Sequence, residues 1–459
     1  MKIQSLAHKK VAIYGYGREG QSILRAIRQQ LPSQPLAILN DTDLVDTLDV
    51  PDKTEVYIGK AITEQLKVMD VVIKSPGIPA YKPEILAAKA QGVAFTSATQ
   101  LWFDEHPQAQ VICVTGTKGK STTSSLIAHL LRAKGVPVAL GGNIGTPLFD
   151  LPEIPQSGYW VLELSSYQTH DLAIKPILNV LLNLFPEHLD WHGNIERYFR
   201  DKLHLLIQSP QTPALLNFTD PQTQDFMPTL QPQLKKIAYF NHNSGFYVKN
   251  GILNNKKQGL LSTTDWHLPG EHNLINLGAA LSTLQQLGFE FNRDTLKTSL
   301  ADFQPLAHRL RTLGQKAGRL YVDDSISTTP QSAQAAVQAF PDYAITLLLG
   351  GYDRGLEWHD AAHFFVARPV QRIITLPENG PRIAAAIHAA QQQNSNPKND
   401  EPEVYAATDL ADAIKQAKQH TPPGGLILLS PGSPSYGTFQ DFKARGKAFA
   451  HYAGFEVIQ

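Results

Sequence analysis

The segment VTGTKGKSTTSS, residues 114–125, constrains the fold of this chain more than any other feature. An apolar run, VICV, leads into it and an amphipathic pattern follows it, which predicts a strand, a glycine-rich turn and a helix. In the common phosphate loop, G-x-x-x-x-G-K-[ST], the first glycine would fall at Val114, whereas this sequence has its glycine at Gly116. The turn is therefore predicted to be a shortened phosphate loop.

The residues of this loop have the chemistry needed to bind a nucleotide. Backbone N–H groups of the turn and of the helix start can surround phosphate, Lys120 can offset phosphate charge and Ser121 can reach a magnesium ion. The alternative is a glycine turn that only starts a helix. We expect nucleotide binding, and the candidate residues are Gly116, Thr117, Lys118, Gly119, Lys120, Ser121 and Thr122.

The composition narrows the class of protein. A length of 459 residues is typical of about three domains. Lys plus Arg and Asp plus Glu both number 41, so no charge excess points to a nucleic-acid or anionic-membrane partner. The sole cysteine, Cys113, excludes an internal disulfide framework, and its apolar neighbours favour a buried thiol. The sequence has neither a signal-peptide pattern nor a membrane-length apolar run, so we expect a cytoplasmic protein.

The pattern along the chain predicts an α/β protein. Strand-like apolar runs alternate with helix-like patterns in three regions, which indicates largely parallel sheets with crossover helices. We expect a Rossmann-like domain at residues 1–108, a phosphate-loop domain with a mainly parallel sheet at 109–305 and a second Rossmann-like domain at 306–459.

A second glycine motif lies near the N-terminus. Gly15, Gly17 and Gly20 follow a strand-like run, and Asp41 comes about twenty residues after them, as in a dinucleotide-binding fingerprint. Glycines admit a diphosphate at a helix start and the acidic residue takes a sugar hydroxyl, so a UDP-sugar fits the pattern as well as NAD does. A tight turn without a ligand is the third alternative.

Candidate cation ligands follow other strand-like runs. Glu163, His188 and Asp190 come after apolar segments, so they are expected at the sheet edge that carries the phosphate loop. Magnesium prefers oxygen ligands, which makes Glu163 the natural choice and His188 the less usual one. Taken alone, His188 would more often cap a helix. We interpret His192 and His204 as surface or packing residues.

A set of motifs occurs in one order along the chain: TGTKGKST, GGNIG, LELSSYQ, EHLDWHG, YFRDK, HN-x-x-N, HR and DDS. This combination resembles the Mur ligase family, and most closely its MurD-like branch, the UDP-N-acetylmuramoyl-L-alanine:glutamate ligases. The resemblance implies an ATP-dependent, ADP-forming ligase of peptidoglycan precursor synthesis, and hence of cell-wall biogenesis, cell shape and cell division. It implies that the three domains bind UDP, ATP and glutamate in turn.

The resemblance also implies site residues. Lys120, His188 and Lys202 would be catalytic, with two magnesium ions held by Ser121, Glu163, His188 and a carbamate on Lys202. The ATP site would be completed by Asn276, Arg309 and Asp324. The UDP substrate would be contacted by Gly15, Tyr16, Gly17, Asp41, Thr42, Ser75, Asn143 and His188. Glutamate would be contacted by Thr328, Arg354, Ser435 and Phe442.

Three segments depart from the usual pattern of the D-glutamate-adding ligases. D-S-K-A-T-N is replaced by DSISTT at 324–329, G-G-x-D-K by GGYDR at 350–354, and S-P-A-x-A-S by SPGSPS at 430–435. Arg354 offers a planar bidentate fork where lysine offers a point charge, so a changed amino-acid preference is expected. The combination resembles the L-glutamate-adding variant, whose product a separate epimerase inverts.

Other functions stay open at this point. The D-glutamate-adding ligase shares the mechanism, and a folylpolyglutamate synthase-like ligase shares the architecture. An NAD-dependent dehydrogenase would account only for Gly15 to Asp41, and a non-catalytic UDP-sugar sensor would not require Lys120, Glu163, His188 and Lys202.

Overall fold

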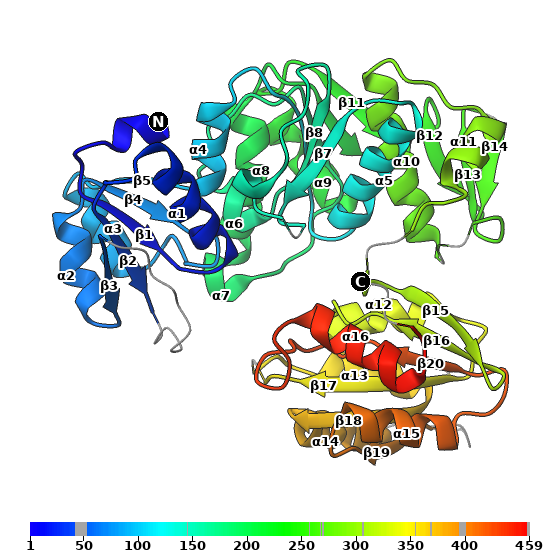
Figure 1. Cartoon of the computed structure of the whole chain (residues 1–459). Helices are drawn as coiled ribbons and strands as arrows, with labels where there is room; N and C mark the ends of the chain where they lie inside the picture. The colour runs from blue at the N-terminus through cyan, green and yellow to red at the C-terminus, as the bar shows by residue number, and fades with distance from the viewer. Residues whose placement is uncertain are drawn as a thin grey trace. The chain divides into compact units, whose positions relative to one another are not determined.

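The structure, a computed structural model, forms two compact units (Figure 1). One comprises Met1–Asp265 with Glu271–Phe303, and the other Trp266–Gly270 with Gln304–Gln459. Thr42, Arg354 and the side chain of Asp190 lie outside the part of the chain that the structure describes. The described residues are 1–41, 53–144, 146–256, 258–266, 268, 270–304, 307–353, 355–367, 370–393 and 401–456.

The first sheet consists of parallel strands in the order β3-β2-β1-β4-β5. These strands are β1 (Val11–Tyr14), β2 (Leu36–Asn40), β3 (Thr54–Ile58), β4 (Val71–Lys74) and β5 (Ala94–Thr96). The helices around it are η1 (Ile3–Leu6), α1 (Arg18–Gln30), α2 (Ala61–Val68), α3 (Pro83–Ala90) and α4 (Ala98–Glu105). The strands β2 and β3 are added on one side of β1, and β4 and β5 on the other. At such a switch point in a parallel sheet, the carboxyl ends of β1 and β4 flank the expected ligand crevice.

The second sheet is also parallel, in the order β11-β10-β9-β6-β8-β7. Its strands are β6 (Gln110–Thr115), β7 (Val138–Gly142), β8 (Tyr159–Glu163), β9 (Leu178–Leu181), β10 (Ala214–Asn217) and β11 (Ile237–Phe240). The inner strands β6, β8 and β9 are almost wholly buried, which explains their continuous apolar runs.

Helices and a small antiparallel sheet complete this unit. The helices are α5 (Lys120–Ala133), η2 (Leu148–Asp150), α6 (Ser166–Thr169), α7 (Leu189–His192), α8 (Ile195–Gln208), α9 (Pro221–Leu230), α10 (Glu271–Gln286) and α11 (Arg293–Leu300). The antiparallel strands are β12 (Phe246–Lys249), β13 (Ile252–Asn255) and β14 (Gln258–Ser262). Helix α10 contacts α5, the helix that follows the phosphate loop, so both helices are largely buried.

The third sheet has the order β15-β16-β20-β17-β18-β19, with β15 antiparallel to β16 and the other neighbours parallel. The strands are β15 (Arg311–Lys316), β16 (Arg319–Asp323), β17 (Ile345–Gly351), β18 (Val370–Glu378), β19 (Glu403–Ala406) and β20 (Leu426–Leu429). The helices are α12 (Pro330–Gln338), α13 (His359–Ala367), α14 (Gly380–Gln393), α15 (Leu410–His420) and α16 (Phe442–Ala453). Apolar clusters lie on both faces of the sheet.

These three sheets confirm the predicted α/β fold with three domains, two of which share the first unit. The boundaries near residues 108 and 305 stay predictions. Cys113 is buried in β6, and burial raises the pKa of its thiol, as expected of a core cysteine.

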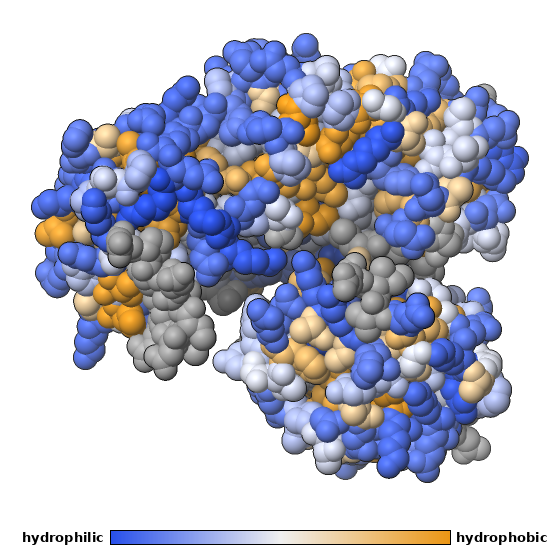
Figure 2. Space-filling view, in the orientation of Figure 1, coloured by the Kyte–Doolittle hydropathy of each residue, from blue (hydrophilic) through white to orange (hydrophobic). Residues whose placement is uncertain are grey.

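The surface mixes hydrophilic and apolar residues, and large apolar side chains are exposed on several separate elements (Figure 2). Isolated exposed apolar residues of this kind are usual on folded domains. No helix among the described residues has the length and apolarity required to cross a membrane.

Candidate functional site

Two glycines give the phosphate loop its shape. Gly116 and Gly119 have φ angles of 145° and 82°, in the region that favours glycine. A Cβ atom on Gly119 would lie 2.3 Å from the amide oxygen of Asn276, and α10 supplies this asparagine. The loop therefore leads directly into α5 with Asn276 against its backbone, and the role of Asn276 in an ATP site stays a prediction.

Asn183, which the sequence analysis missed, holds the loop from the neighbouring strand. The backbone N–H groups of Thr117 and Lys118 donate to Asn183 Oδ1 at 3.1 and 2.8 Å, and Asn183 Nδ2 donates to Lys118 O at 3.1 Å. Tyr198 on α8 lies on the other side, with its hydroxyl 2.7 Å from Thr117 Oγ1. Asn183 follows β9, so a polar residue after an apolar strand was the available signal.

The lysines of the loop have different surroundings. Lys120 Nζ donates to Thr117 O at 2.9 Å, which keeps its ammonium over the turn. Lys118 forms an ion pair with Glu187. Burial opposes ionisation of Glu187, but Lys118 and the neighbouring His188 and Lys120 keep its pKa below the usual value. Glu187 therefore supplies a negative charge beside a loop rich in cations.

Glu163 ends β8 at the carboxyl edge of the sheet, beside the strand that leads into the loop. Its backbone is in register with Val114, and its side chain is only 1% exposed. Asn143 Nδ2 donates to Glu163 Oε1 at 2.7 Å, whereas Glu163 Oε2 accepts no hydrogen bond from the described residues. A buried carboxylate oxygen without a donor is suited to a hard cation.

Lys202 reaches the loop from α8. Its side chain is 2% exposed, and its Nζ donates to Gly116 O at 2.9 Å. Burial and the Lys120 ammonium lower the pKa of Lys202 well below its usual value. Burial and like charge therefore favour the neutral amine, which is the nucleophilic form.

His188 lies at the start of α7 in the left-handed region, with a φ angle of 56°. Its Nε2 is 3.7 Å from Glu187 Oε2, and its ring centroid is 4.8 Å from that of Tyr167. Ser121 and Thr122 are buried in the first turn of α5. Within the described ranges, no three His, Cys, Asp or Glu side chains are clustered as a metal centre.

The first domain brings most of its predicted residues to one edge. Ser75 Oγ donates to Gly15 O at 2.6 Å, and the backbone N–H of Tyr16 donates to Asn40 Oδ1 at 3.2 Å. Gly17 is exposed where α1 begins. These positions surround the carboxyl ends of β1, β2 and β4, where the strand order places a ligand.

Asp41 is already engaged by two donors in this structure. Tyr14 OH donates to Asp41 Oδ1 at 2.8 Å, and Lys82 Nζ donates to Asp41 Oδ2 at 2.7 Å. Burial raises the pKa of Tyr14 to about 12, so the phenol keeps its proton. A ligand hydroxyl at Asp41 would join this network, and Lys82 is a neighbour that the sequence analysis did not identify.

The second unit has polar groups at the carboxyl ends of β16, β20 and β17. Asp324 accepts from Ser430 Oγ at 2.7 Å and from the backbone N–H of Leu310 at 3.1 Å. Burial raises the pKa of Asp324 to about 7, although the Ser430 hydroxyl opposes the rise. Arg309 precedes Leu310 in the chain, so both predicted ATP-site residues of this unit lie at one edge.

Arg445, another residue without a sequence prediction, joins two of the departing segments. Its guanidinium donates to Ser325 O at 2.8 Å, to Ser433 O at 2.9 Å and to Pro434 O at 3.1 Å. It is 1% exposed, and burial lowers its pKa to about 10. The buried arginine thereby fixes segments 324–329 and 430–435 against each other, and Ser435 and Thr328 lie in these segments.

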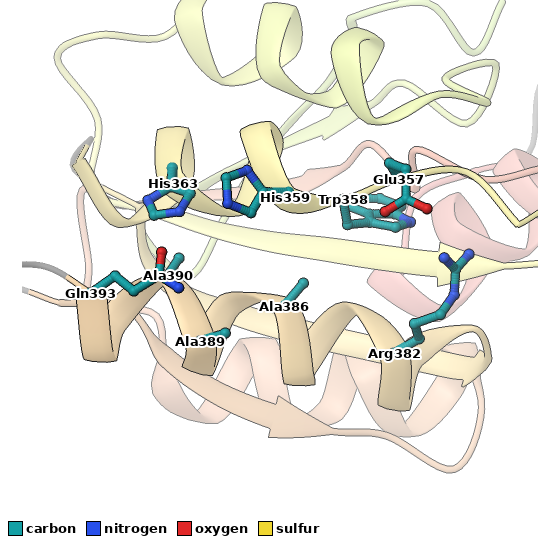
Figure 3. A pocket seen from close by; sticks show the side chains of 9 residues that line it. All are labelled: Glu357, Trp358, His359, His363, Arg382, Ala386, Ala389, Ala390 and Gln393. Atoms are coloured by element: carbon teal, nitrogen blue, oxygen red, sulfur yellow. The ribbon is translucent and has the colours of Figure 1, made fainter.

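The third departing segment is held by Arg382. From the start of α14, Arg382 donates to both carboxylate oxygens of Asp353 and to Leu356 O, the last at 2.9 Å. The predicted Arg354 lies between these residues in the chain. Arg382 also lies at one end of a pocket of about 310 Å³ between α13 and α14 (Figure 3). The pocket is lined by Glu357, Trp358, His359, His363, Arg382, Ala386, Ala389, Ala390 and Gln393.

The remaining glutamate-site prediction, Phe442, begins α16, and its backbone carbonyl accepts from Ser325 Oγ at 2.8 Å. The structure thus assembles the predicted residues in groups. The loop, Asn143, Glu163, His188, Lys202 and Asn276 lie in the first unit with the UDP-site residues. Arg309, Asp324, Thr328, Ser435 and Phe442 lie in the second unit.

Family models match each of the three domains. The model of the Mur ligase MurD-like N-terminal domain matches residues 9–97. The Mur ligase middle domain matches residues 114–284, and the Mur ligase glutamate ligase domain matches residues 308–432.

Curated relatives match along nearly their whole length. One relative is a protein of Xanthomonas euvesicatoria pv. vesicatoria (strain 85-10), named UDP-N-acetylmuramoyl-L-alanine--L-glutamate ligase. It is 43% identical, and the match covers 99% of this chain and 97% of the relative. Proteins of the same name from Xylella fastidiosa (strain 9a5c) and Salinispora tropica are 41% and 37% identical over 99% and 98% of this chain, and are covered to 97% and 98%.

Solved structures share the fold at low identity. UDP-N-acetylmuramate-alanine ligase MurC from Thermotoga maritima is 16% identical with a TM-score of 0.60, over 97% of this chain and 99% of that chain. MurF ligase from the same organism, in complex with ADP, is 16% identical with a TM-score of 0.56, over 98% of this chain and 96% of that chain.

Proposed function

The chain belongs to the Mur ligase family, and we propose that it joins glutamate, as the L enantiomer, to UDP-N-acetylmuramoyl-L-alanine in peptidoglycan precursor synthesis. Members of this kind are ATP-dependent, ADP-forming acid–amino-acid ligases. The observation that carries the proposed site is the buried Glu163 Oε2, without a donor among the described residues, beside the shortened phosphate loop. Activating a carboxylate with ATP requires a phosphate site and a counter-charge, and this edge offers both.

The proposed reaction has two balanced steps. The γ-phosphoryl group of ATP passes to the alanine carboxylate, which gives ADP and an acyl phosphate. The glutamate amine then attacks the acyl carbon and loses a proton as the amide forms, and inorganic phosphate leaves. Lys120 offsets the charge on the transferred group, while the N–H groups of the loop orient the phosphates.

Two magnesium ions are part of the proposal. Ser121 and Glu163 would hold one, and His188 with a modified Lys202 would help to hold the other. When bound, the ions neutralise phosphate charge. The buried Glu163 Oε2, which has no donor in the described part of the chain, supports this assignment, because a hard cation would compensate its negative charge.

The modification proposed for Lys202 is a carbamate. The neutral amine attacks carbon dioxide, a nitrogen–carbon bond forms, and the nitrogen releases one proton to leave a carbamate anion. The lowered pKa of Lys202 supports this step, because a protonated amine has no free electron pair. The product replaces a cation that would repel magnesium by an oxygen ligand that would bind it.

The first domain is proposed to bind the UDP part of the substrate. Gly15, Tyr16, Gly17 and Ser75 would surround the diphosphate, and Asp41 would accept from a ribose hydroxyl. Asn143 and His188 would contact the muramoyl-alanine part, with the adjacent Glu163 at the phosphate end. Thr42 stays a prediction for the same site.

L-glutamate is the proposed amino acid, and D-glutamate is the alternative. The names of the relatives specify L-glutamate. The replaced segments around residues 326, 354 and 430–435 support the same preference, and Thr328, Arg354, Ser435 and Phe442 are the proposed contacts. If the L product must match a D-glutamate-containing peptidoglycan, an epimerase has to act on it.

The test is a ligation assay with purified protein, ATP, magnesium and UDP-N-acetylmuramoyl-L-alanine, run with enantiopure L- or D-glutamate. We expect phosphate release and a product of the ligated mass only when every substrate is present, and faster with L-glutamate. Lys120→Ala should lose turnover by at least about 100-fold but still bind the UDP substrate, because that site lies in the first domain. The exposed Lys235→Ala serves as the control.

Two results would count against the proposal in different ways. A rate of ATP hydrolysis that does not depend on the UDP substrate would contradict the ligase assignment. A preference for D-glutamate would correct only the amino acid, and would leave the phosphate-loop assignment in place.

A further inference from the structure

A buried polar cluster lies behind the candidate phosphate site and includes none of its predicted residues. His192 Nδ1 is 2.7 Å from Asp201 Oδ2, and His192 Nε2 is 3.0 Å from Ser166 Oγ. Tyr81 OH donates to both carboxylate oxygens of Asp201, at 2.7 and 2.8 Å. His192 is fully buried and the Asp201 side chain is 4% exposed, so this is an internal network.

Each central-domain member of the cluster is close in the chain to a proposed metal ligand. These pairs are Asp201 with Lys202, His192 with His188, and Ser166 with Glu163. Glu163 ends β8, His188 precedes α7, and Lys202 lies on α8, so these three proposed ligands come from three different segments. The cluster joins the same three segments through side chains, so it fixes their relative positions.

The geometry of α8 shows how this acts on Lys202. Successive helical residues point about 100° apart, so Asp201 and Lys202 anchor different faces of the same turn. Lys202 Nζ reaches Gly116 O, whereas the carboxylate of Asp201 turns toward His192 and its backbone carbonyl accepts from Thr169 Oγ1 at 2.8 Å. These two anchors act together with the buried apolar face of α8 to fix the rotation of the helix about its axis.

The cluster also extends to the first domain. Tyr81 belongs to the segment 75–82, which follows β4 and contains the proposed UDP contact Ser75. The same segment is held at a second point, since Trp191 Nε1 donates to Pro76 O at 3.0 Å. Trp191 on α7 and Asp201 on α8 therefore each hold the segment 75–82.

Burying a carboxylate removes it from water at a large cost in free energy. Hydrogen bonds offset this desolvation cost only if every donor is well placed, and apolar residues of similar size are often as stabilising. Such groups are better explained where they specify one geometry, and side chains that orient metal ligands are a common example.

We propose that Asp201 and His192 are positioning residues for Lys202 and His188. Tyr81 couples this arrangement to the segment 75–82. The inference rests on the proposed function for the identity of the ligands. It assigns to the cluster neither metal contact nor proton transfer.

The test measures magnesium-dependent ADP binding by calorimetry as well as turnover. Asp201→Asn keeps the shape of the side chain but removes its charge. Tyr81→Phe removes only a hydroxyl, and its ring can keep the edge contact with Trp191, in which the ring centroids are 5.9 Å apart. We expect Asp201→Asn to raise the magnesium concentration needed for half-maximal ADP binding by about 10- to 100-fold and to lower kcat. Tyr81→Phe should act in the same direction with a smaller effect, while KM for glutamate stays unchanged.

A double-mutant comparison shows whether the residues act as one unit. We expect the effect of Tyr81→Phe to disappear in the Asp201→Asn background. Asp225→Asn, an exposed carboxylate on α9, and Tyr159→Phe are the matched controls. Unchanged magnesium dependence in folded Tyr81→Phe and Asp201→Asn would overturn the proposal. If Asp201→Asn does not fold, unchanged magnesium dependence in Tyr81→Phe alone would do so.

The two proposals can fail separately. A wild-type protein that binds magnesium–ADP but does not ligate glutamate would refute the proposed function, and the binding comparison among variants would still decide the role of Asp201.

Discussion

At the scale of single residues, the site depends on charges that burial makes unfavourable. Lys202 lies among Lys118, Lys120 and the loop backbone, where a third ammonium would repel the other two. Burial lowers the pKa of Lys202 because a charge is unfavourable away from water. For the same reason, a buried carboxylate oxygen such as Glu163 Oε2 is stabilised by a partner. A carbamate on Lys202 and a cation at Glu163 would resolve both costs, which links the two assignments physically.

This link leads to a prediction for Lys202. We expect Lys202→Ala to lose at least about 100-fold in ligation rate, because the proposed oxygen ligand is removed. Formate or acetate should restore part of the activity by supplying a carboxylate to the vacated space. The measurement is the ligation rate with and without formate or acetate at roughly 100 mM. The control Lys235→Ala should ligate at the wild-type rate, and added carboxylate should not change that rate. A fully active Lys202→Ala would contradict the assignment.

At the scale of secondary-structure elements, the parallel strands could be predicted from the sequence and the antiparallel ones could not. Strands such as β1 and β8 are buried on both faces, so their apolar runs are continuous. Strands β12 and β13 have four residues each with mixed exposure, which leaves no clear period to recognise.

The site shows the same division. Glu163 and the loop residues could be predicted because they follow apolar strands or fit a spaced motif. Asn183 also follows an apolar strand, but that position alone does not show that its side chain holds the loop. Arg445 has no such signal. Both roles arise from contacts between segments far apart in the chain. For Asp201, the residue type in a helix gives no sign that its partners come from α7 and the segment 75–82.

Helix α1 carries a buried carboxylate whose titration can be measured. Glu19, in its first turn, accepts from Gln168 Nε2 at 3.0 Å, and burial raises its pKa to about 7, partly offset by Lys74. The ordinary value is 4.5, so the folded state binds more protons than the unfolded state between pH 4.5 and 7. The contribution of Glu19 to stability is therefore present below pH 4.5 and is lost as the pH rises through 7.

We predict that Glu19→Gln raises the melting temperature at pH 8 but changes it little at pH 5. Glutamine still accepts from Gln168 but cannot ionise, so the variant avoids a cost on the order of 3 kcal/mol at the higher pH. Melting curves of both proteins at pH 5, 6, 7 and 8 provide the measurement. Glu64→Gln, at an exposed position on α2, is the control, and an equal shift at every pH would argue against ionisation of a buried Glu19.

At the scale of the whole molecule, the proposed reaction needs residues from both compact units. The loop and Lys202 lie in the first unit, whereas Arg309 and Asp324 lie in the second. Each unit has its own sheet and its own apolar clusters. A unit with its own core can be stable by itself.

We therefore expect a fragment of residues 306–459 to fold independently. Its sheet has apolar clusters on both faces, and the buried Arg445 and Asp324 find their hydrogen-bond partners inside the fragment. The fragment omits Trp266–Gly270, which belongs to the same unit, so its melting temperature should be lower than that of the domain in the full chain. Circular dichroism should show a single cooperative unfolding transition, and the fragment should release no phosphate from ATP, because the phosphate loop is absent. Gradual, non-cooperative unfolding would contradict the expected domain boundary at residue 306.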